Sequence, residues 1–218
     1  MAGPVEPVTT DTYEVELKLQ PLESKTLDDV WDLERIADFE VVSRHHLQLR
    51  SQYFDSTDNA LDRAGGNLRW RTIAGASEAE LTYKGPSQVN NGVFRRLEIT
   101  ALLPANVDPL SVQPTPRPVE LARRITEELR ATQLVLDDDR RGMRLVGHGA
   151  TVEVDLDIST MPGTTYLDLE IEAEMVDGNP SVLADLEAAL ATVGPVKRST
   201  KGKRARAWDF VRHSRHAE

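Results

Sequence analysis

Ionisable side chains alternate with apolar ones near the start of the chain, in residues 13–19. The charged members of this segment are Glu14, Glu16 and Lys18. Because successive side chains of a β-strand point to opposite faces, all three share one face of the predicted strand. Carboxylates at this spacing can bind a divalent cation, and a lysine can bind phosphate. For one strand alone, an acidic face in water is the simpler explanation.

The same alternation recurs in later segments, and the sign of the charge differs from one segment to the next. Acidic residues occupy the charged face at Glu14, Glu16, Glu153, Asp155, Asp157, Asp168, Glu170 and Glu172. Basic residues occupy it at Arg69, Arg71, Arg96, Arg140, Arg144, Lys201 and Lys203. Several arginines and lysines can hold a polyphosphate, and oxygen ligands without histidine or cysteine favour Mg²⁺ or Mn²⁺. The pattern therefore predicts a site for a phosphate compound bridged by metal ions.

Hydrophobic periodicity predicts the elements that must position these side chains. Apolar residues at helical spacing predict helices at 26–37, 119–130 and 180–193. Alternation predicts strands at 13–19, 43–54, 68–71, 78–84, 93–101, 134–136, 140–146, 151–158 and 166–174. Residues 201–206 are expected to be strand-like or partly helical, and Asp137–Asp139 to form a turn or a solvated surface. His45 and His46 are expected on the surface of a strand, not as metal ligands.

Two arrangements of these strands are physically possible. In the ordinary one, the apolar faces meet in a core and the charged faces lie in water. In the inverted one, helices cover the apolar faces and the charged faces line a central cavity. The three amphipathic helices need apolar surface to cover, which favours the inverted arrangement. Charges inside such a cavity must compensate each other or bind ions, because an unpaired buried charge is very costly.

Length and composition limit the class of protein. The 218 residues are enough for one large domain, and a net charge of −10 argues against general nucleic-acid binding. No apolar run is long enough to span a bilayer, and the lack of cysteine excludes disulfides and thiolate metal sites. A cytoplasmic location is therefore expected. The expected organisation is a disordered lead-in at 1–11, a single domain at 12–210 and a polar tail at 211–218.

The segment Glu14-Val15-Glu16-Leu17-Lys18 resembles the E-x-E-x-K signature of the CYTH superfamily, the triphosphate tunnel metalloenzymes. Further segments resemble motifs of that family in the family's order: Tyr53-Phe54-Asp55, Leu68-Arg69-Trp70-Arg71, Leu81-Thr82-Tyr83-Lys84-Gly85-Pro86, Arg96-Leu97-Glu98, 153–157, Leu169-Glu170-Ile171-Glu172 and Lys203-Arg204-Ala205-Arg206. The resemblance spans residues 12–210. It implies an α+β fold, in which a closed eight-stranded antiparallel β-barrel forms a tunnel and helices pack on the outside.

The resemblance also implies a role for each matching residue. The implied phosphate contacts are Lys18, Arg69, Arg71, Lys84, Arg96, Arg140 and Lys203. The implied ligands of Mg²⁺ or Mn²⁺ are Glu14, Glu16, Asp155, Glu170 and Glu172. Water would attack a phosphorus atom of the substrate, and the candidate catalytic residues are Glu14, Glu16, Lys18 and Glu98.

The sequence departs from the family's pattern in two segments. Thr100 stands where many members carry a second glutamate, and Asp138 and Asp139 stand where a lysine is common. Both changes put turnover in question more than they do the fold. Alternatives for two of the basic roles also stay open: Arg141 or Arg144 in place of Arg140, and Lys201 in place of Lys203.

The leading functional hypothesis is metal-dependent hydrolysis of a small triphosphate, with inorganic triphosphate or thiamine triphosphate as substrate. The expected partners are this substrate alone, without nucleic acid or membrane, and the chain is expected to be a monomer or a homodimer. An adenylyl cyclase of the same superfamily is one alternative, although the sequence does not locate an adenine pocket. A non-catalytic module that binds triphosphate or polyphosphate is the other, and the departures at positions 100, 138 and 139 support it. Only 5% of residues are aromatic, which favours a plain phosphate substrate over one with a stacked ring.

Overall fold

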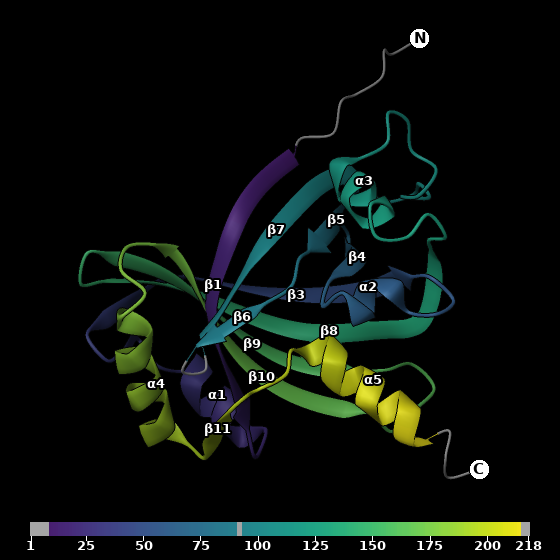
Figure 1. The fold of residues 1–218 in the computed structure, drawn as a ribbon. Helices are drawn as coiled ribbons and strands as arrows, with labels where there is room; N and C mark the ends of the chain where they lie inside the picture. Colours follow the sequence, from purple (N-terminus) through teal and green to yellow (C-terminus); the bar gives the residue numbers. More distant parts are fainter. Residues whose placement is uncertain (1–8, 91–92, 215–218) are drawn as a thin grey trace. The chain divides into compact units, whose positions relative to one another are not determined.

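A computed structural model describes residues 9–90 and 93–214 of the chain, which form a large sheet and five helices (Figure 1). The strands are β1 (Thr9–Pro21), β2 (Arg35–Ile36), β3 (Phe39–Asp55), β4 (Asn67–Ile73), β5 (Glu78–Lys84), β6 (Gln88–Asn90), β7 (Val93–Pro104), β8 (Arg130–Gly147), β9 (Ala150–Thr160), β10 (Leu167–Asp177) and β11 (Val196–Arg198). The helices are α1 (Lys25–Trp31), α2 (Ala60–Arg63), α3 (Arg117–Arg123), α4 (Val182–Val193) and α5 (Lys203–Ser214).

The order of hydrogen-bonded strands closes on itself. The sheet runs β11-β1-β10-β9-β8-β3-β4-β5-β7-β6, β2 pairs with β3, and β1 pairs also with β7. Eight strands are therefore paired in a closed ring, in the order β1-β10-β9-β8-β3-β4-β5-β7 and back to β1. The predicted antiparallel sheet of eight strands with closed pairing is confirmed.

The chain divides into two compact units. Among the described residues, unit 1 comprises 9–13, 48–88 and 96–137, and unit 2 comprises 14–47, 89–90, 93–95 and 138–214. Each unit has a hydrophobic core of its own.

In unit 2, helices cover the apolar face of the sheet. Leu17 and Leu19 of β1 lie in a core with buried side chains of α1 and α4, such as Leu27 and Leu186. Glu16 and Lys18, which alternate with these leucines along the strand, are also almost fully buried, on the opposite face of β1. A strand that buries charged side chains on one face and packs helices on the other matches the inverted arrangement. The inverted arrangement is therefore confirmed for this unit.

In unit 1, the core lies between α3 and the strands β4 and β5. Leu68 and Trp70 of β4 and Leu81 of β5 pack with Val119 and Ala122 of α3. Arg69 and Arg71, which alternate with these apolar residues along β4, are buried as well. Unit 1 therefore repeats the arrangement of unit 2, with basic side chains on the face that the helix does not cover.

A buried carboxylate holds the connection from β3 to α2 in unit 1. The Oδ1 of Asp55 accepts hydrogen bonds from the backbone N–H groups of Ser56, at 2.7 Å, and Leu61, at 2.8 Å. Its Oδ2 accepts one from the N–H of Asp62, at 3.0 Å. N–H groups in the first turn of a helix have no partner within the helix, so a carboxylate that accepts from them stabilises the turn.

Replacing Asp55 by alanine is expected to lower the free energy of unfolding by about 2 kcal/mol, because buried N–H groups lose their acceptor. Urea denaturation of both proteins measures the difference. Asp108→Ala is the matched control, because this exposed carboxylate accepts comparable bonds from Leu110 and Ser111 and water can replace it. Equal losses in the two variants would contradict the account.

Several predicted elements have different bounds in the structure. The predicted helix at 26–37 ends at Trp31, because Arg35 and Ile36 pair with β3 instead. The predicted helix at 119–130 spans Arg117–Arg123, and that at 180–193 spans Val182–Val193. Asp137–Asp139 do not form a turn, because β8 runs unbroken through these residues. The side chains of Asp137 and Asp139 are partly exposed to solvent, as the alternative of a solvated surface predicted, whereas Asp138 is buried. Residues 201–206 contain the start of a helix, α5, and no strand.

The ends of the chain were predicted to be a lead-in and a tail. Strand β1 already begins at Thr9, and residues 1–8 of the predicted lead-in lie outside the described residues. Helix α5 continues to Ser214, and residues 215–218 of the predicted tail lie outside as well. None of the helices in the described part of the chain has the length and apolar character needed to cross a membrane.

Candidate functional site

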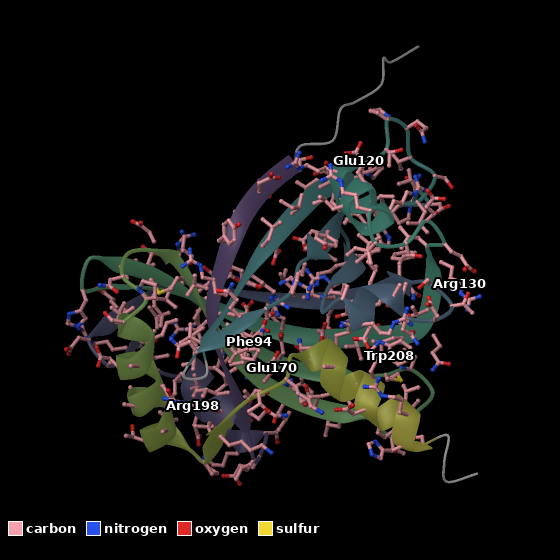
Figure 2. All side chains as sticks on the ribbon, in the orientation of Figure 1. Phe94, Glu120, Arg130, Glu170, Arg198 and Trp208 are labelled. Atoms are coloured by element: carbon pink, nitrogen blue, oxygen red, sulfur yellow. The ribbon has the colours of Figure 1, made fainter. Side chains whose placement is uncertain are left out.

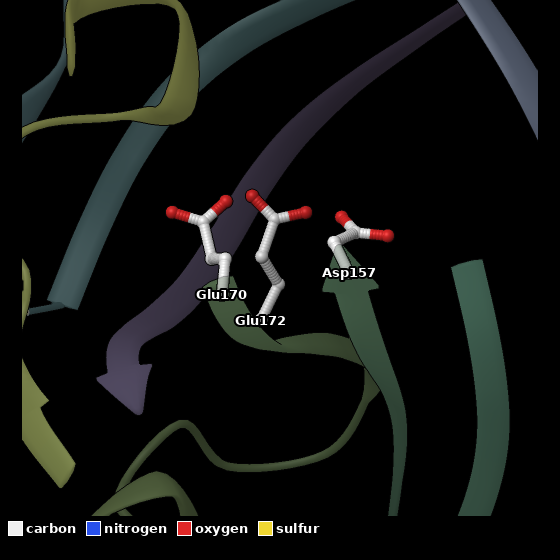
Figure 3. Close-up of side chains that lie close together, drawn as sticks. All are labelled: Asp157, Glu170 and Glu172. Carbon is white, nitrogen blue, oxygen red and sulfur yellow. The ribbon is translucent and has the colours of Figure 1, made fainter. Parts of the chain in front are cut away.

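Three carboxylates of unit 2 meet on the charged face of its sheet. Asp157 of β9 and Glu170 and Glu172 of β10 each place one oxygen within 4.8 Å of the other two. Figure 3 shows the three side chains close together. Strand register explains the meeting: Glu170 lies opposite Asp157, and Glu172 is the next residue of β10 on the same face. The cluster thus requires both the alternation within β10 and its pairing with β9.

Two of the three carboxylates of this cluster, Asp157 and Glu170, are 0% exposed, and Glu172 is 18% exposed. The Oε1 of Glu170 accepts a hydrogen bond from Arg206, whereas its Oε2 is buried and has no hydrogen-bond partner among residues 9–90 and 93–214. A buried carboxylate oxygen without a donor is costly unless a proton or a cation binds to it.

The two glutamates of the cluster differ in acidity. Burial and the adjacent charge of Glu172 raise the pKa of Glu170 to about 8, against the opposing effect of Lys18 and Arg206. Burial alone would also raise the pKa of Glu172. The nearby charges of Lys18, Lys203 and Arg140 outweigh burial and hold the pKa of Glu172 well below its usual range. Near neutral pH, Glu172 is therefore ionised and Glu170 holds a proton that a cation could displace.

Four cationic side chains of unit 2 surround the cluster, and each forms more than one ion pair. Lys18 bonds Glu16 at 2.6 Å and also contacts Glu172. Arg140 donates to both oxygens of Asp157, at 2.8 and 2.6 Å, and to Glu172, at 3.1 Å. It also contacts Asp155.

The other two cations come from α5. Lys203 lies 2.5 Å from Asp157 and 3.1 Å from Asp138, and Arg206 binds Asp168 and Glu170, both at 2.6 Å. The ion pairs of the four cations include seven carboxylates: Glu16, Asp138, Asp155, Asp157, Asp168, Glu170 and Glu172. A buried carboxylate needs a cation, a proton or a metal ion as its partner.

Unit 1 carries the basic counterpart of this network. Lys84 of β5 lies 2.6 Å from Glu98 of β7, its partner in the strand register. Arg71 donates to the hydroxyl of Ser51 at 3.3 Å, and Arg69 lies 4.0 Å from Glu80. Arg96 is half-buried on β7. Guanidinium and ammonium groups of this kind can bind the oxygens of a phosphate.

The sequence comparison decides the family. The model of the CYTH domain matches residues 12–206. The chain belongs to the CYTH domain family. No curated protein matches the sequence.

Solved structures of similar fold agree with the CYTH assignment. HpAC1 from Hippeastrum, described as a candidate adenylyl cyclase with a dominant triphosphatase activity, superposes with a TM-score of 0.68 at 19% identity, covering 90% of this chain and 95% of that chain. A candidate adenylate cyclase from Bacillus halodurans gives 0.62 at 20%, covering 89% and 97%. The PH1819 protein from Pyrococcus horikoshii gives 0.52 at 23%, covering 86% and 94%. At these identities, the likeness shows the CYTH fold alone.

The acidic cluster contains some of the residues that the CYTH resemblance implies as metal ligands. Glu170 and Glu172 belong to it. Asp155 lies beside it in contact with Arg140, and Glu16 bonds Lys18. Glu14 is buried on the same strand as Glu16. All five implied ligands are thus in unit 2, although the cluster of three oxygens includes only two of them.

Four residues of this CYTH site were missing from the implied ligand and phosphate sets: Asp138, Asp157, Asp168 and Arg206. Strand parity already placed Asp157 and Asp168 on the charged face, but only the register shows which acids meet. Arg206 lies one helical turn after Lys203, a spacing that could have paired them once the helix was known. Asp138 was expected in a turn, whereas it is 2% exposed and binds Lys203 and the hydroxyl of Ser159.

The donor set of the CYTH cluster suits an oxygen-preferring divalent cation. Three carboxylates offer oxygen ligands from two neighbouring strands, and one of these ligands, Glu170, has a buried oxygen without a hydrogen-bond donor among the described residues. A hard cation that prefers oxygen ligands satisfies both conditions.

Proposed function

We propose that the chain is a divalent-cation-dependent hydrolase of a small triphosphate. The observation that carries the proposal is the buried cluster of Asp157, Glu170 and Glu172 surrounded by cations that are already paired with carboxylates. A cluster of acids alone would repel a phosphate, and a cluster of bases alone would not hold a metal ion. A site with both can bind a triphosphate together with Mg²⁺ or Mn²⁺.

In the proposed site, Asp157, Glu170 and Glu172 hold the cation. Glu14 and Glu16 of β1 and Asp155 of β9 support it. Lys18, Arg140 and Lys203 contact the phosphate in unit 2. Their counterparts in unit 1 stay predicted phosphate contacts: Arg69, Arg71, Lys84 and Arg96. When bound, the divalent cation neutralises charge on the transferred phosphoryl group and activates or orients water.

The cations of unit 2 can accept phosphate without a large change in charge. Lys18 and Arg140 both bind carboxylates, so a phosphate oxygen would replace one anion by another. Arginine binds both carboxylate and phosphate through two parallel N–H groups. The buried site is therefore organised for an anion before the substrate arrives, which lowers the cost of binding.

Inorganic triphosphate is the preferred substrate of the proposal, and thiamine triphosphate is the second. The low aromatic content offers little surface for stacking a nucleobase or a thiazole ring. The triphosphatase activity described for HpAC1, a protein of the same fold, supports hydrolysis of a triphosphate by analogy.

A substrate panel tests the proposed reaction. Purified chain is incubated with inorganic triphosphate, thiamine triphosphate or ATP, each with Mg²⁺ or Mn²⁺, and both phosphate and cyclic AMP are measured. Phosphate release that EDTA abolishes is the expected result. Cyclic AMP from ATP would instead identify a cyclase, the activity named for the Hippeastrum and Bacillus proteins.

A non-catalytic triphosphate-binding module is the second candidate, because two predicted site positions are engaged in other contacts. Thr100 shares a hydrogen bond with Thr82 at 3.0 Å, where many family members are expected to carry a glutamate. Asp138 binds Lys203, one of the implied phosphate contacts. Calorimetry that shows metal-dependent binding of triphosphate, with no phosphate released in the panel, would favour the module.

The protonation of Glu170 predicts how metal binding depends on pH. The pKa of Glu170 is raised to about 8, so the group loses its proton only as the pH rises through that value. A cation binds the ionised carboxylate, and the apparent affinity for Mn²⁺ is therefore expected to increase from about pH 6 to about pH 9. Glu170→Gln, which has no proton to lose, is expected to bind more weakly and with a smaller dependence on pH. Titrations of the two proteins at several pH values measure this, and equal slopes would contradict it.

A further inference from the structure

Arg206 of α5 contacts the acidic cluster, although the family resemblance does not imply it as a phosphate contact. Arg206 lies in the first turn of the helix. Figure 2 labels Glu170 and also Trp208, which follows Arg206 by two residues in α5. It donates through Nη2 to Glu170 Oε1 at 2.6 Å and to Asp168 Oδ2 at 2.6 Å. Its Nε donates to Asp168 Oδ1 at 3.0 Å.

Arg206 is itself fixed on several sides. Its two bonds to Asp168 form a bidentate pair, and its Nη1 donates to the hydroxyl of Ser199 at 2.8 Å. Asp168 and Ser199 are buried, and Gln20 donates to Asp168 at 3.3 Å. A guanidinium held in this manner has little freedom to rotate, so the oxygen of Glu170 that it binds is held as well.

The contact with Arg206 leaves the two oxygens of Glu170 in different states. Oε1 has a charged donor, whereas Oε2 is buried and has no hydrogen-bond partner among the described residues. Figure 3 shows one oxygen of Glu170 directed toward Glu172 and the other directed away. Carboxylates that bind metals commonly accept a hydrogen bond from an outer partner, which orients the ligand.

We propose that Arg206 is a positioning residue that orients Glu170, so that one oxygen of this carboxylate is presented to a divalent cation shared with Asp157 and Glu172. The inference rests on the proposed metal site. This role differs from that of Lys203, which lies one turn earlier in α5. Lys203 forms its ion pairs with Asp157 and Asp138. Arg206 acts through Glu170 and needs no contact with substrate.

Binding of Mn²⁺ to the full chain, followed by the electron paramagnetic resonance signal of the free ion, tests this role. Arg206→Gln is expected to lower the affinity for Mn²⁺ about tenfold to a hundredfold, the usual effect of removing an outer partner of a metal ligand. Arg206→Lys keeps the charge but cannot bind Asp168 and Glu170 as a fork, so it is expected to restore only part of the affinity. At saturating Mn²⁺, the KM for inorganic triphosphate should stay near the wild-type value.

Arg212→Gln is the matched control, because Arg212 lies on the same helix, is 57% exposed and pairs with Asp209. It should bind Mn²⁺ like the wild type. An Arg206→Gln protein that melts like the wild type and binds Mn²⁺ equally well would overturn the proposal and leave Arg206 as an anchor of α5.

A second pair of variants keeps the test decisive if Arg206→Gln does not fold. Asp168→Asn weakens the bidentate pair that holds Arg206 and leaves Glu170 unchanged. Both this variant and Arg206→Lys should bind Mn²⁺ more weakly than the wild type. Wild-type affinity in both would overturn the proposal. A wild-type chain that binds no Mn²⁺ would overturn the proposed function and, with it, the role of Arg206. If only the proposed role of Arg206 is wrong, the wild-type chain still binds Mn²⁺, so the two failures are distinguishable.

Discussion

Replacing Glu172 by glutamine is expected to lower kcat for triphosphate hydrolysis on the order of 1,000-fold, comparable to the loss of a main electrostatic group in an active site. Glu172 belongs to the three-carboxylate cluster and contacts both Lys18 and Arg140. Its low pKa keeps it ionised, so the substitution removes a full charge from the proposed metal site. Glutamine has nearly the same volume, and the backbone of β10 should keep its pairing with β1 and β9. Phosphate release at saturating triphosphate measures the loss.

The control for this experiment is Glu187→Gln. Glu187 lies on α4 in the same unit and forms an ion pair with Arg198, at 2.5 and 2.7 Å, away from the acidic network. Surface pairs of this kind contribute little to stability, and kcat should stay at the wild-type value. Equal rates for wild type, Glu172→Gln and Glu187→Gln would show that the acidic cluster takes no part in the reaction.

Replacing Asp157 by asparagine is expected to lower the free energy of unfolding by about 3 kcal/mol at neutral pH, because the substitution breaks buried ion pairs. Asp157 is 0% exposed, and Arg140 and Lys203 both donate to its carboxylate. The two cations keep other acidic partners, Asp155 and Glu172 for Arg140 and Asp138 for Lys203, which limits the loss. Urea denaturation with EDTA present measures the difference without a metal contribution.

The pH dependence of that difference has a definite sign. Burial opposes ionisation of Asp157, but Arg140 and Lys203 outweigh it and hold its pKa below the usual range. A carboxylate with a lowered folded-state pKa stabilises the fold above its unfolded pKa, which is about 4, and this stability is lost as the pH falls toward the folded value. The gap between wild type and Asp157→Asn should therefore be smaller at about pH 3 than at about pH 7.

Asp209→Asn provides the comparison for Asp157→Asn. Asp209 also forms two ion pairs, with Lys201 and Arg212, and its pKa is lowered as well by its hydrogen bonds with them. The carboxylate of Asp209 is partly exposed to water, however, so its loss should change the free energy of unfolding by less than about 1 kcal/mol. Similar losses for the two aspartates would contradict the importance of the buried network.

The sequence was sufficient to predict the faces of the strands. Alternation in residues 13–19 placed Glu16 and Lys18 opposite Leu17 and Leu19, and all four are buried on the predicted faces. The need of the helices for apolar surface then indicated the inverted arrangement, which α1 and α4 confirm in unit 2. These features follow from a period of two within a strand, which is a local property.

The composition of the acidic cluster could not be predicted to the same degree, because it depends on register between strands. Alternation within β10 gives Glu170 and Glu172 one face, but only pairing with β9 brings Asp157 opposite Glu170. Nothing local to either strand sets that register. The resemblance to the family named Asp155 instead, the neighbour of Asp157 on the same face, which contacts Arg140.

Local rules failed most clearly at Asp138 and in α5. Three consecutive aspartates are typical of a turn, yet β8 continues through them because Asp138 is buried against Ser159 and Lys203. The segment 201–206 is strongly basic, and its helical form places Lys203 and Arg206 against the acids of β9 and β10. In both cases, charges distant in the sequence determine the local structure.

The hydrolysis of inorganic triphosphate, followed by ³¹P nuclear magnetic resonance with Mg²⁺ or Mn²⁺, tests the central claim most directly. The resonances of triphosphate should give way to those of diphosphate and phosphate in the wild-type chain, and should persist after addition of EDTA and in Glu172→Gln. Triphosphate that stays intact with both metals, or that disappears equally fast in wild type and Glu172→Gln, would contradict the claim that this buried acidic cluster serves a metal-dependent triphosphatase.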